Sequence, residues 1–115
     1  MLDTLRTANI VRQARWPGAH KADLTFRALE VCGEVGELAE AVKKYLRRRE
    51  GIAGSQASVR NIADELGDVI VTCDLLARDL DIDLSEAVMR KFNQTSDKYG
   101  IDVKIVDSGQ VQHAE

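Results

Sequence analysis

Two short acidic motifs are the residues of this sequence most suited to chemistry. The stretches "EVGEL" at 34–38 and "ELGDV" at 65–69 share one order: acid, apolar residue, glycine, acid, apolar residue. Their acids are Glu34 and Glu37 in the first motif and Glu65 and Asp68 in the second. Carboxylate oxygens are hard ligands that suit Mg²⁺ and Mn²⁺. The repeated spacing therefore indicates a candidate divalent-metal site.

Helical geometry places the two motifs in equivalent positions. With about 100° between successive residues, Glu34 and Glu37 fall about 40° and 100° to one side of the apolar stripe of their helix. Glu65 and Asp68 stand at the same two angles on the next helix. If the two helices pack antiparallel through their stripes, we expect the four carboxylates to converge at the edge of the core.

The ordinary alternative is that these acids are solvated and paired with basic residues one turn away. The turns next to Glu34, Glu37 and Asp68 contain no lysine or arginine, whereas Glu40 has Lys44 one turn further on. Converging carboxylates repel one another, and their pKa values rise unless a cation neutralises them. We therefore predict a Mg²⁺ site, with Mn²⁺ as the alternative ion.

Three glycines surround the motifs inside the predicted helices. Gly33, Gly36 and Gly67 each cost a helix about 1 kcal/mol relative to alanine. We expect this cost to be offset by the close approach of a neighbouring helix or of a bound ligand to the backbone. The alternative is that they are merely small packing residues at a helix contact.

The elements that position the motifs are predicted to be helices. Helical periodicity covers 3–15, 21–48, a segment that Ser58 caps and that stops near 81–83, and a last segment that Asp83 or Ser85 caps. Gly100 suits the left-handed position past the end of this last helix. The sequence predicts an all-α class, with one domain over 1–100. The tail at 101–115 is expected to form a short extended segment or to be disordered.

Composition restricts the partners. The net charge of -3 mixes both signs, and the basic run "KKYLRRRE" is typical of a solvated helix end, so nucleic acid is not expected. No segment reaches the roughly 18 apolar residues of a membrane helix. Cys32 and Cys73 lack a CxxC spacing, which favours free thiols and a cytoplasmic protein. A chain of 115 residues with few aromatics is expected to form a homo-oligomer, a dimer or a tetramer.

Beyond the acidic motifs, the stretches "GEVGELAEAVKK", "DELGDVIVTCDLLARDLDIDLSEAV" and "KFNQTSDKYG" resemble the MazG-like family of the all-α nucleoside triphosphate pyrophosphohydrolase superfamily. The resemblance runs from about 24 to 99. It implies a four-helix bundle-like fold and Mg²⁺-dependent hydrolysis of a nucleoside triphosphate to the monophosphate and pyrophosphate, in nucleotide-pool housekeeping. The metal ligands that it implies are Glu34, Glu37, Glu65 and Asp68, with Glu34 and Glu37 also catalytic.

The resemblance also implies how substrate is bound. Many relatives carry a glutamate at the position of Gly33, so the role of general base falls here to Glu30, to one of the ligands, or to a water activated by the metal. Each of two candidates for binding substrate also has an ordinary structural interpretation. Trp16 could instead be a core aromatic, and Lys91 could instead be a solvated lysine on a helix. The implied substrate-binding positions are Lys91, Asn93, Lys98 and Trp16.

Two other functions stay open from the sequence. One is a phosphoribosyl-ATP pyrophosphohydrolase, which the ending "KFNQTSDKYG" disfavours because it is similar to MazG-like proteins. The other is a non-catalytic helical module for partner binding or regulation, against which the intact set of four acids argues.

Overall fold

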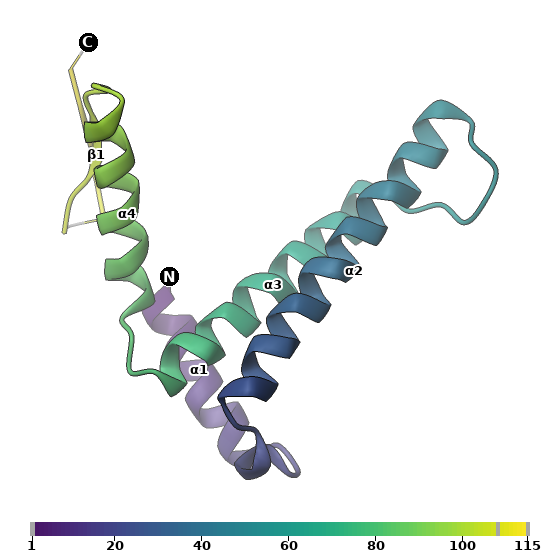
Figure 1. Ribbon diagram of the computed structural model, residues 1–115, viewed down its shortest axis with the longest axis horizontal. Coiled ribbons are helices and arrows are strands. Elements are labelled where there is room, and N and C mark those ends of the chain that lie inside the picture. The colour runs from purple at the N-terminus through teal and green to yellow at the C-terminus, as the bar shows by residue number, and fades with distance from the viewer. Residues whose placement is uncertain (1, 108, 115) are drawn as a thin grey trace.

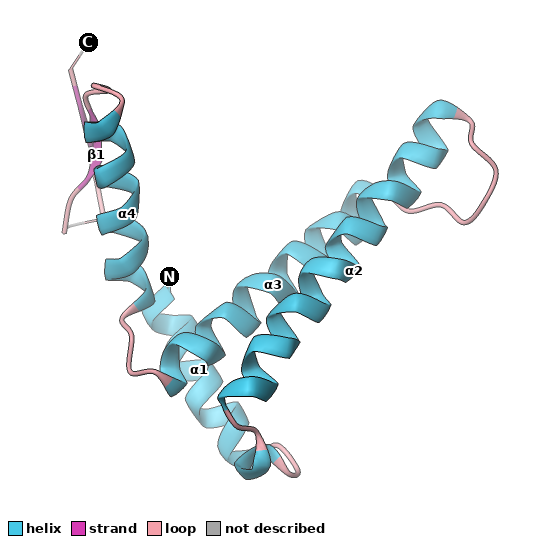
Figure 2. Cartoon of the chain, viewed as in Figure 1, coloured by secondary structure: helices cyan, strands magenta, loops and turns pink. Residues whose placement is uncertain are grey.

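A computed structural model describes residues 2–107 and 109–114, and in them the chain forms four α-helices and one small hairpin. The prediction of an all-α class is confirmed, since the described residues contain just two three-residue strands beside the helices (Figures 1 and 2). The elements are α1 (Leu2–Arg15), the one-turn 3-10 helix η1 (Ala19–Lys21), α2 (Leu24–Glu50), α3 (Val59–Asp79), α4 (Leu84–Lys98), β1 (Val103–Ile105) and β2 (Val111–His113).

Side-chain caps fix where three of the helices begin. The Asp23 carboxylate accepts a hydrogen bond from the Phe26 N–H at 2.9 Å, which starts α2 three residues later than predicted. Ser58 caps α3 as predicted, in a reciprocal capping box with Asn61. Of the two candidates for α4, Asp83 is the cap. Each cap satisfies backbone N–H groups that the first turn of a helix leaves free.

The antiparallel pair α2 and α3 is the centre of the fold. These two helices make the most extensive contact between elements and run side by side, while α1 crosses the end of α3 (Figure 1). Helix α4 packs against β1 and the start of α1 and extends away from the α2–α3 pair. A single chain therefore shows an open arrangement of its four described helices instead of a closed bundle.

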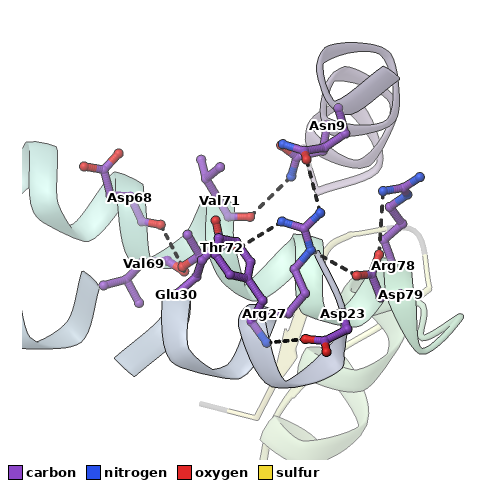
Figure 3. A network of polar contacts seen from close by, with 12 residues as sticks. Asn9, Asp23, Arg27, Glu30, Asp68, Val69, Val71, Thr72, Arg78 and Asp79 are labelled. Carbon is purple, nitrogen blue, oxygen red and sulfur yellow. Dashed lines mark hydrogen bonds and ion pairs between the residues drawn. The ribbon is translucent and has the colours of Figure 1, made fainter. Parts of the chain in front are cut away.

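A buried polar network fastens α1 to α3. Asp74 is fully buried and accepts hydrogen bonds from Arg6 Nε at 3.0 Å and Asn9 Nδ2 at 2.9 Å. Asn9 Nδ2 also donates to the Val71 carbonyl at 3.3 Å (Figure 3). Buried charges and amides are tolerated when they are paired in this way. The junction of α1 and α3 thus includes a buried ion pair and two amide hydrogen bonds.

The single chain leaves an unusual amount of apolar surface uncovered. Its accessible surface is 8384 Å², against about 6,200 Å² for a compact monomer of this mass. Its radius of gyration is 17.6 Å, against about 13 Å for a compact domain. By their positions around the helix axes, five exposed residues lie on the side of the α2–α3 pair away from the acids, and we call them the open apolar face. They are Val35, Val42, Leu46, Leu66 and Ile70.

The glycines in the motifs do not mark a close approach within the chain. A Cβ added at Gly33, Gly36 or Gly67 would meet no atom within 4 Å. The expectation that a neighbouring helix touches these backbones is therefore wrong for the described residues, because α2 and α3 contact each other through other positions. The space beside these glycines is open in the single chain.

The tail forms a hairpin against α4, the first of its two expected alternatives. Strands β1 and β2 pair antiparallel, with Val103 opposite His113. The Asn93 amide of α4 holds β1 by donating to the Ile105 carbonyl and accepting from the Ile105 N–H, both at 2.8 Å. Gly100 precedes the hairpin with a left-handed φ of 65°, as predicted. None of the helices in the described part of the chain combines the length and apolarity needed to span a bilayer.

Candidate metal centre

The antiparallel pairing of α2 and α3 brings three of the four motif acids together. Glu34 and Glu37 of α2 and Glu65 of α3 each offer one carboxylate oxygen, and these three oxygens lie within 4.8 Å of one another. Asp68 lies one turn after Glu65 and is outside this close group. Its charge nevertheless acts on both Glu34 and Glu65. The predicted convergence thus holds for three carboxylates, with the fourth at the margin.

Two oxygens of the cluster have no partner among the described residues. Glu34 Oε2 and Glu65 Oε2 are both buried, and neither forms a hydrogen bond within that part of the chain. A buried polar atom without a partner costs free energy, and a carboxylate oxygen costs more than a neutral one. Divalent cations such as Mg²⁺ and Mn²⁺ bind this kind of oxygen. The residues present therefore fit a divalent metal ion.

Electrostatics in the cluster point the same way. Burial, and then the negative charges of Asp68 and Glu37, raise the pKa of Glu34 above its usual value. Burial, and then the charges of Glu37 and Asp68, raise the pKa of Glu65. Burial and repulsion therefore make these two carboxyls easier to protonate than an exposed glutamate, whereas a bound cation would favour their ionised form.

Glu40 shows how a solvated acid of the same helix behaves. Its carboxylate forms an ion pair with Lys43 Nζ at 2.9 Å, and this hydrogen bond lowers the pKa of Glu40. The prediction that Lys44 pairs with Glu40 is wrong, because Lys43 makes the contact instead. Glu40 nevertheless has the basic partner that the motif acids lack, and it serves as their matched control.

A cavity of about 550 Å³ adjoins the acids. Glu34 and Asp68 line one part of it, and Trp16, Phe26 and Leu75 supply apolar wall. Cavities of roughly 300 to 1,000 Å³ with apolar walls and a few polar groups are typical of small-molecule sites. Trp16 is 57 % exposed, so its alternative as an ordinary core aromatic is wrong. Its role in holding substrate stays a prediction.

Three cationic residues of this cavity were missed by the sequence reasoning. They are Arg12 of α1, Lys21 of η1 and Arg27 of α2. Arg12 lies four residues before Trp16, about one helical turn along the chain. This spacing could have predicted that Arg12 lies near Trp16 in the cavity. No comparable signal exists for Lys21, because its position depends on how the loop after α1 folds back.

The three candidates on α4 do not reach the cavity within the described chain. Lys91 Nζ donates to Gln94 at 3.4 Å, and Lys98 Nζ lies 5.5 Å from the centre of the Tyr99 ring. The Asn93 amide is engaged by the backbone of β1. The physical reason is the divergence of α4 from α2 and α3, which the sequence pattern of single helices does not encode.

Arg27 ties Glu30 into a second buried network. Its side chain is only 4 % exposed and donates to Glu30 Oε1 at 2.9 Å and to Asp79 Oδ2 at 3.0 Å (Figure 3). Arg27 Nη2 also donates to Gln13 Oε1 at 3.1 Å. Glu30, one of the candidates for general base, thus has one oxygen occupied by a buried guanidinium.

Comparisons with known proteins agree with this arrangement. A family model described as the MazG-like family matches residues 30–108, which include both acidic motifs. The gene 37 protein of Mycobacterium phage L5 is 36 % identical over 85 residues, which cover 70 % of this chain and 74 % of the phage protein. No solved structure matches the chain significantly.

The raised pKa values predict how pH affects the metal-free protein. A folded carboxyl with a raised pKa binds protons that the unfolded chain has already released, so its contribution to stability falls as pH rises above the ordinary glutamate pKa. Glu65→Gln removes one such group. In EDTA, we expect the melting temperature of this variant relative to the wild type to increase between about pH 4.5 and pH 7.

Glu40→Gln is the control for this measurement, because the pKa of Glu40 is shifted in the opposite direction to that of Glu65. A lowered pKa contributes stability above the ordinary glutamate pKa and loses it as pH falls, so this variant gains nothing on the wild type at pH 7. Its effect stays small because solvent screens exposed ion pairs. A Glu65→Gln difference that does not change with pH would refute the electrostatic account of the cluster.

Proposed function

The chain belongs to the MazG-like family, and we propose that it is a divalent-metal-dependent nucleoside triphosphate pyrophosphohydrolase, which converts a ribo- or deoxyribonucleoside triphosphate to the monophosphate and pyrophosphate. The observation that carries the proposal is the cluster of Glu34, Glu37 and Glu65, with two buried oxygens that lack partners, beside a ligand-sized cavity. Nucleotide-pool housekeeping is the role that suits such an enzyme.

The proposed ligands are Glu34, Glu37 and Glu65, with Asp68 at the margin of the group. Mg²⁺ is the proposed ion and Mn²⁺ the alternative, because all the donors are carboxylate oxygens. Once bound, the ion would neutralise negative charge on the phosphates and lower the pKa of a water molecule that it binds.

The side chains of the cavity bind and orient the nucleotide in this proposal. Trp16 offers an exposed ring on which a nucleobase can stack, and Arg12 and Lys21 neutralise phosphate oxygens. Water attacks the α-phosphorus, and Glu34 or Glu37 accepts its proton. Glu30 is less suited to this task, because its Oε1 already accepts a hydrogen bond from Arg27.

A homo-oligomer is part of the same proposal. The open apolar face on α2 and α3 and the large exposed surface of one chain support pairing with a second copy. Lys91 and Lys98 then act as substrate-binding residues supplied by the α4 of a neighbouring copy. Asn93 has a positioning role, because its amide is already held by Ile105.

The two unpartnered oxygens argue against a non-catalytic module, because an acid cluster kept only for packing would be paired or replaced. No contact of the described residues specifically favours phosphoribosyl-ATP as the substrate. Cys32 and Cys73 are free thiols, which agrees with the proposed cytoplasmic location.

Hydrolysis products and one variant test the proposed reaction. With Mg²⁺ and a panel of nucleoside triphosphates, we expect monophosphate and pyrophosphate in equal amounts, resolved by chromatography. Glu65→Gln should lower turnover by about 100-fold or more, since even outer partners of metal ligands cost 10- to 100-fold. Glu40→Gln should hydrolyse at nearly the wild-type rate. Release of orthophosphate with a nucleoside diphosphate, or an unimpaired Glu65→Gln enzyme, would overturn the proposal.

Light scattering at micromolar concentration tests the oligomer. We expect a native mass of at least twice the 12.7 kDa of one chain. Val42→Glu places a charge on the open apolar face and should shift the protein toward the single-chain mass. Val111→Glu is the matched control, because Val111 is exposed on β2 outside that face. A single-chain mass for the wild type would rule out the oligomer and leave the metal site untouched.

A further inference from the structure

Gln13 of α1 lines the cavity beside the acids. Trp16 follows three residues later, just past the end of α1, and lines the same cavity. Gln13 and Trp16 also border a smaller hollow of about 280 Å³, which His20 and Arg78 line and which none of the four motif acids reaches. A nucleotide whose phosphates reach Glu34 must therefore lie in the larger cavity.

The orientation of the Gln13 amide is fixed by its partner. Gln13 Oε1 accepts a hydrogen bond from Arg27 Nη2 at 3.1 Å. A guanidinium has N–H donors and no acceptor, so only the oxygen end of the amide can face it. Arg27 itself is held by Glu30 and Asp79 and is almost fully buried. The amide therefore has little freedom to turn over.

The other end of the amide is left as a donor. Within residues 2–107 and 109–114, the one side-chain hydrogen bond that Gln13 makes is through Oε1, so both N–H groups of Nε2 are available to a ligand. A donor-only group next to a stacking ring discriminates between bases by what they present at their polar edge. A keto oxygen accepts from it, whereas an exocyclic amino group meets it donor to donor.

We infer that Gln13 is a specificity-determining residue, whose Nε2 donates to the keto oxygen at C4 of a pyrimidine or C6 of a purine. Uracil, thymine, guanine and hypoxanthine are then favoured over cytosine and adenine, which carry an amino group at that position. This inference rests on the proposed function, because it takes the ligand to be a nucleoside triphosphate. Arg27 is the positioning residue in this arrangement, since it acts on the base only through Gln13.

Binding measured without hydrolysis tests the inference. Trp16 is the single tryptophan, so its fluorescence reports occupancy of the cavity. The probes are the α,β-imido triphosphates of deoxyuridine and deoxycytidine in Mg²⁺, which cannot be cleaved at that bond. We expect the wild type to bind the uracil compound about tenfold more tightly, the difference that one hydrogen bond makes.

Gln13→Glu presents only acceptors, so the preference should disappear or reverse toward cytosine. Gln13→Met, which removes the donor and adds no charge, should abolish the preference without reversing it. Gln112→Glu is the control on the exposed strand β2 and should keep the wild-type ratio.

Equal binding of the two probes by the wild type, or an unchanged ratio in Gln13→Met, would overturn the inference. If the hydrolysis panel then still gives monophosphate and pyrophosphate, the proposed function stands without it. If no nucleoside triphosphate is bound or cleaved, both are overturned together.

Discussion

Mutual repulsion of carboxylates at a helix contact is the constraint on which the rest of this structure depends. Helix pairs usually meet through apolar side chains, but the contact of α2 with α3 includes Glu34 and Glu65, each with a buried oxygen that nothing in the described chain satisfies. Such a contact is unfavourable by itself. A divalent ion bound by these acids, as the proposed function requires, would turn the same arrangement into a stabilising one, because binding to the folded state alone stabilises that state.

The cavity beside the acids depends on two polar networks that a compact apolar core would not need. Arg6 and Asn9 hold α1 to Asp74 of α3, and Arg27 joins α1, α2 and the end of α3 through Gln13, Glu30 and Asp79. These directional contacts hold α1 in place while leaving space between the helices. An apolar junction would tend to close that space. Fixed polar groups at its wall are also what a selective ligand site requires.

Local signals in the sequence predicted the start of α3, the end of α4 and the convergence of three of the four motif acids. Ser58 and Gly100 act at one helix end each, and the repeated motif fixes the faces of Glu34 and Glu65 through helical periodicity alone. Sequence reasoning failed where the answer depends on contacts between distant segments. The divergence of α4, the position of Lys21 and the open space at Gly36 are such cases, because each depends on how whole helices are placed.

The central claim, that the acids of α2 and α3 together hold a divalent ion, is tested most directly by titrating the protein with Mn²⁺ and following the electron paramagnetic resonance signal of the free ion. The signal falls as Mn²⁺ leaves bulk water for protein ligands. We expect the wild type and Glu40→Gln to remove it equally, and the double variant Glu34→Gln with Glu65→Gln to leave it nearly unchanged at the same concentrations. Equal loss of the free signal with the double variant would contradict the claim.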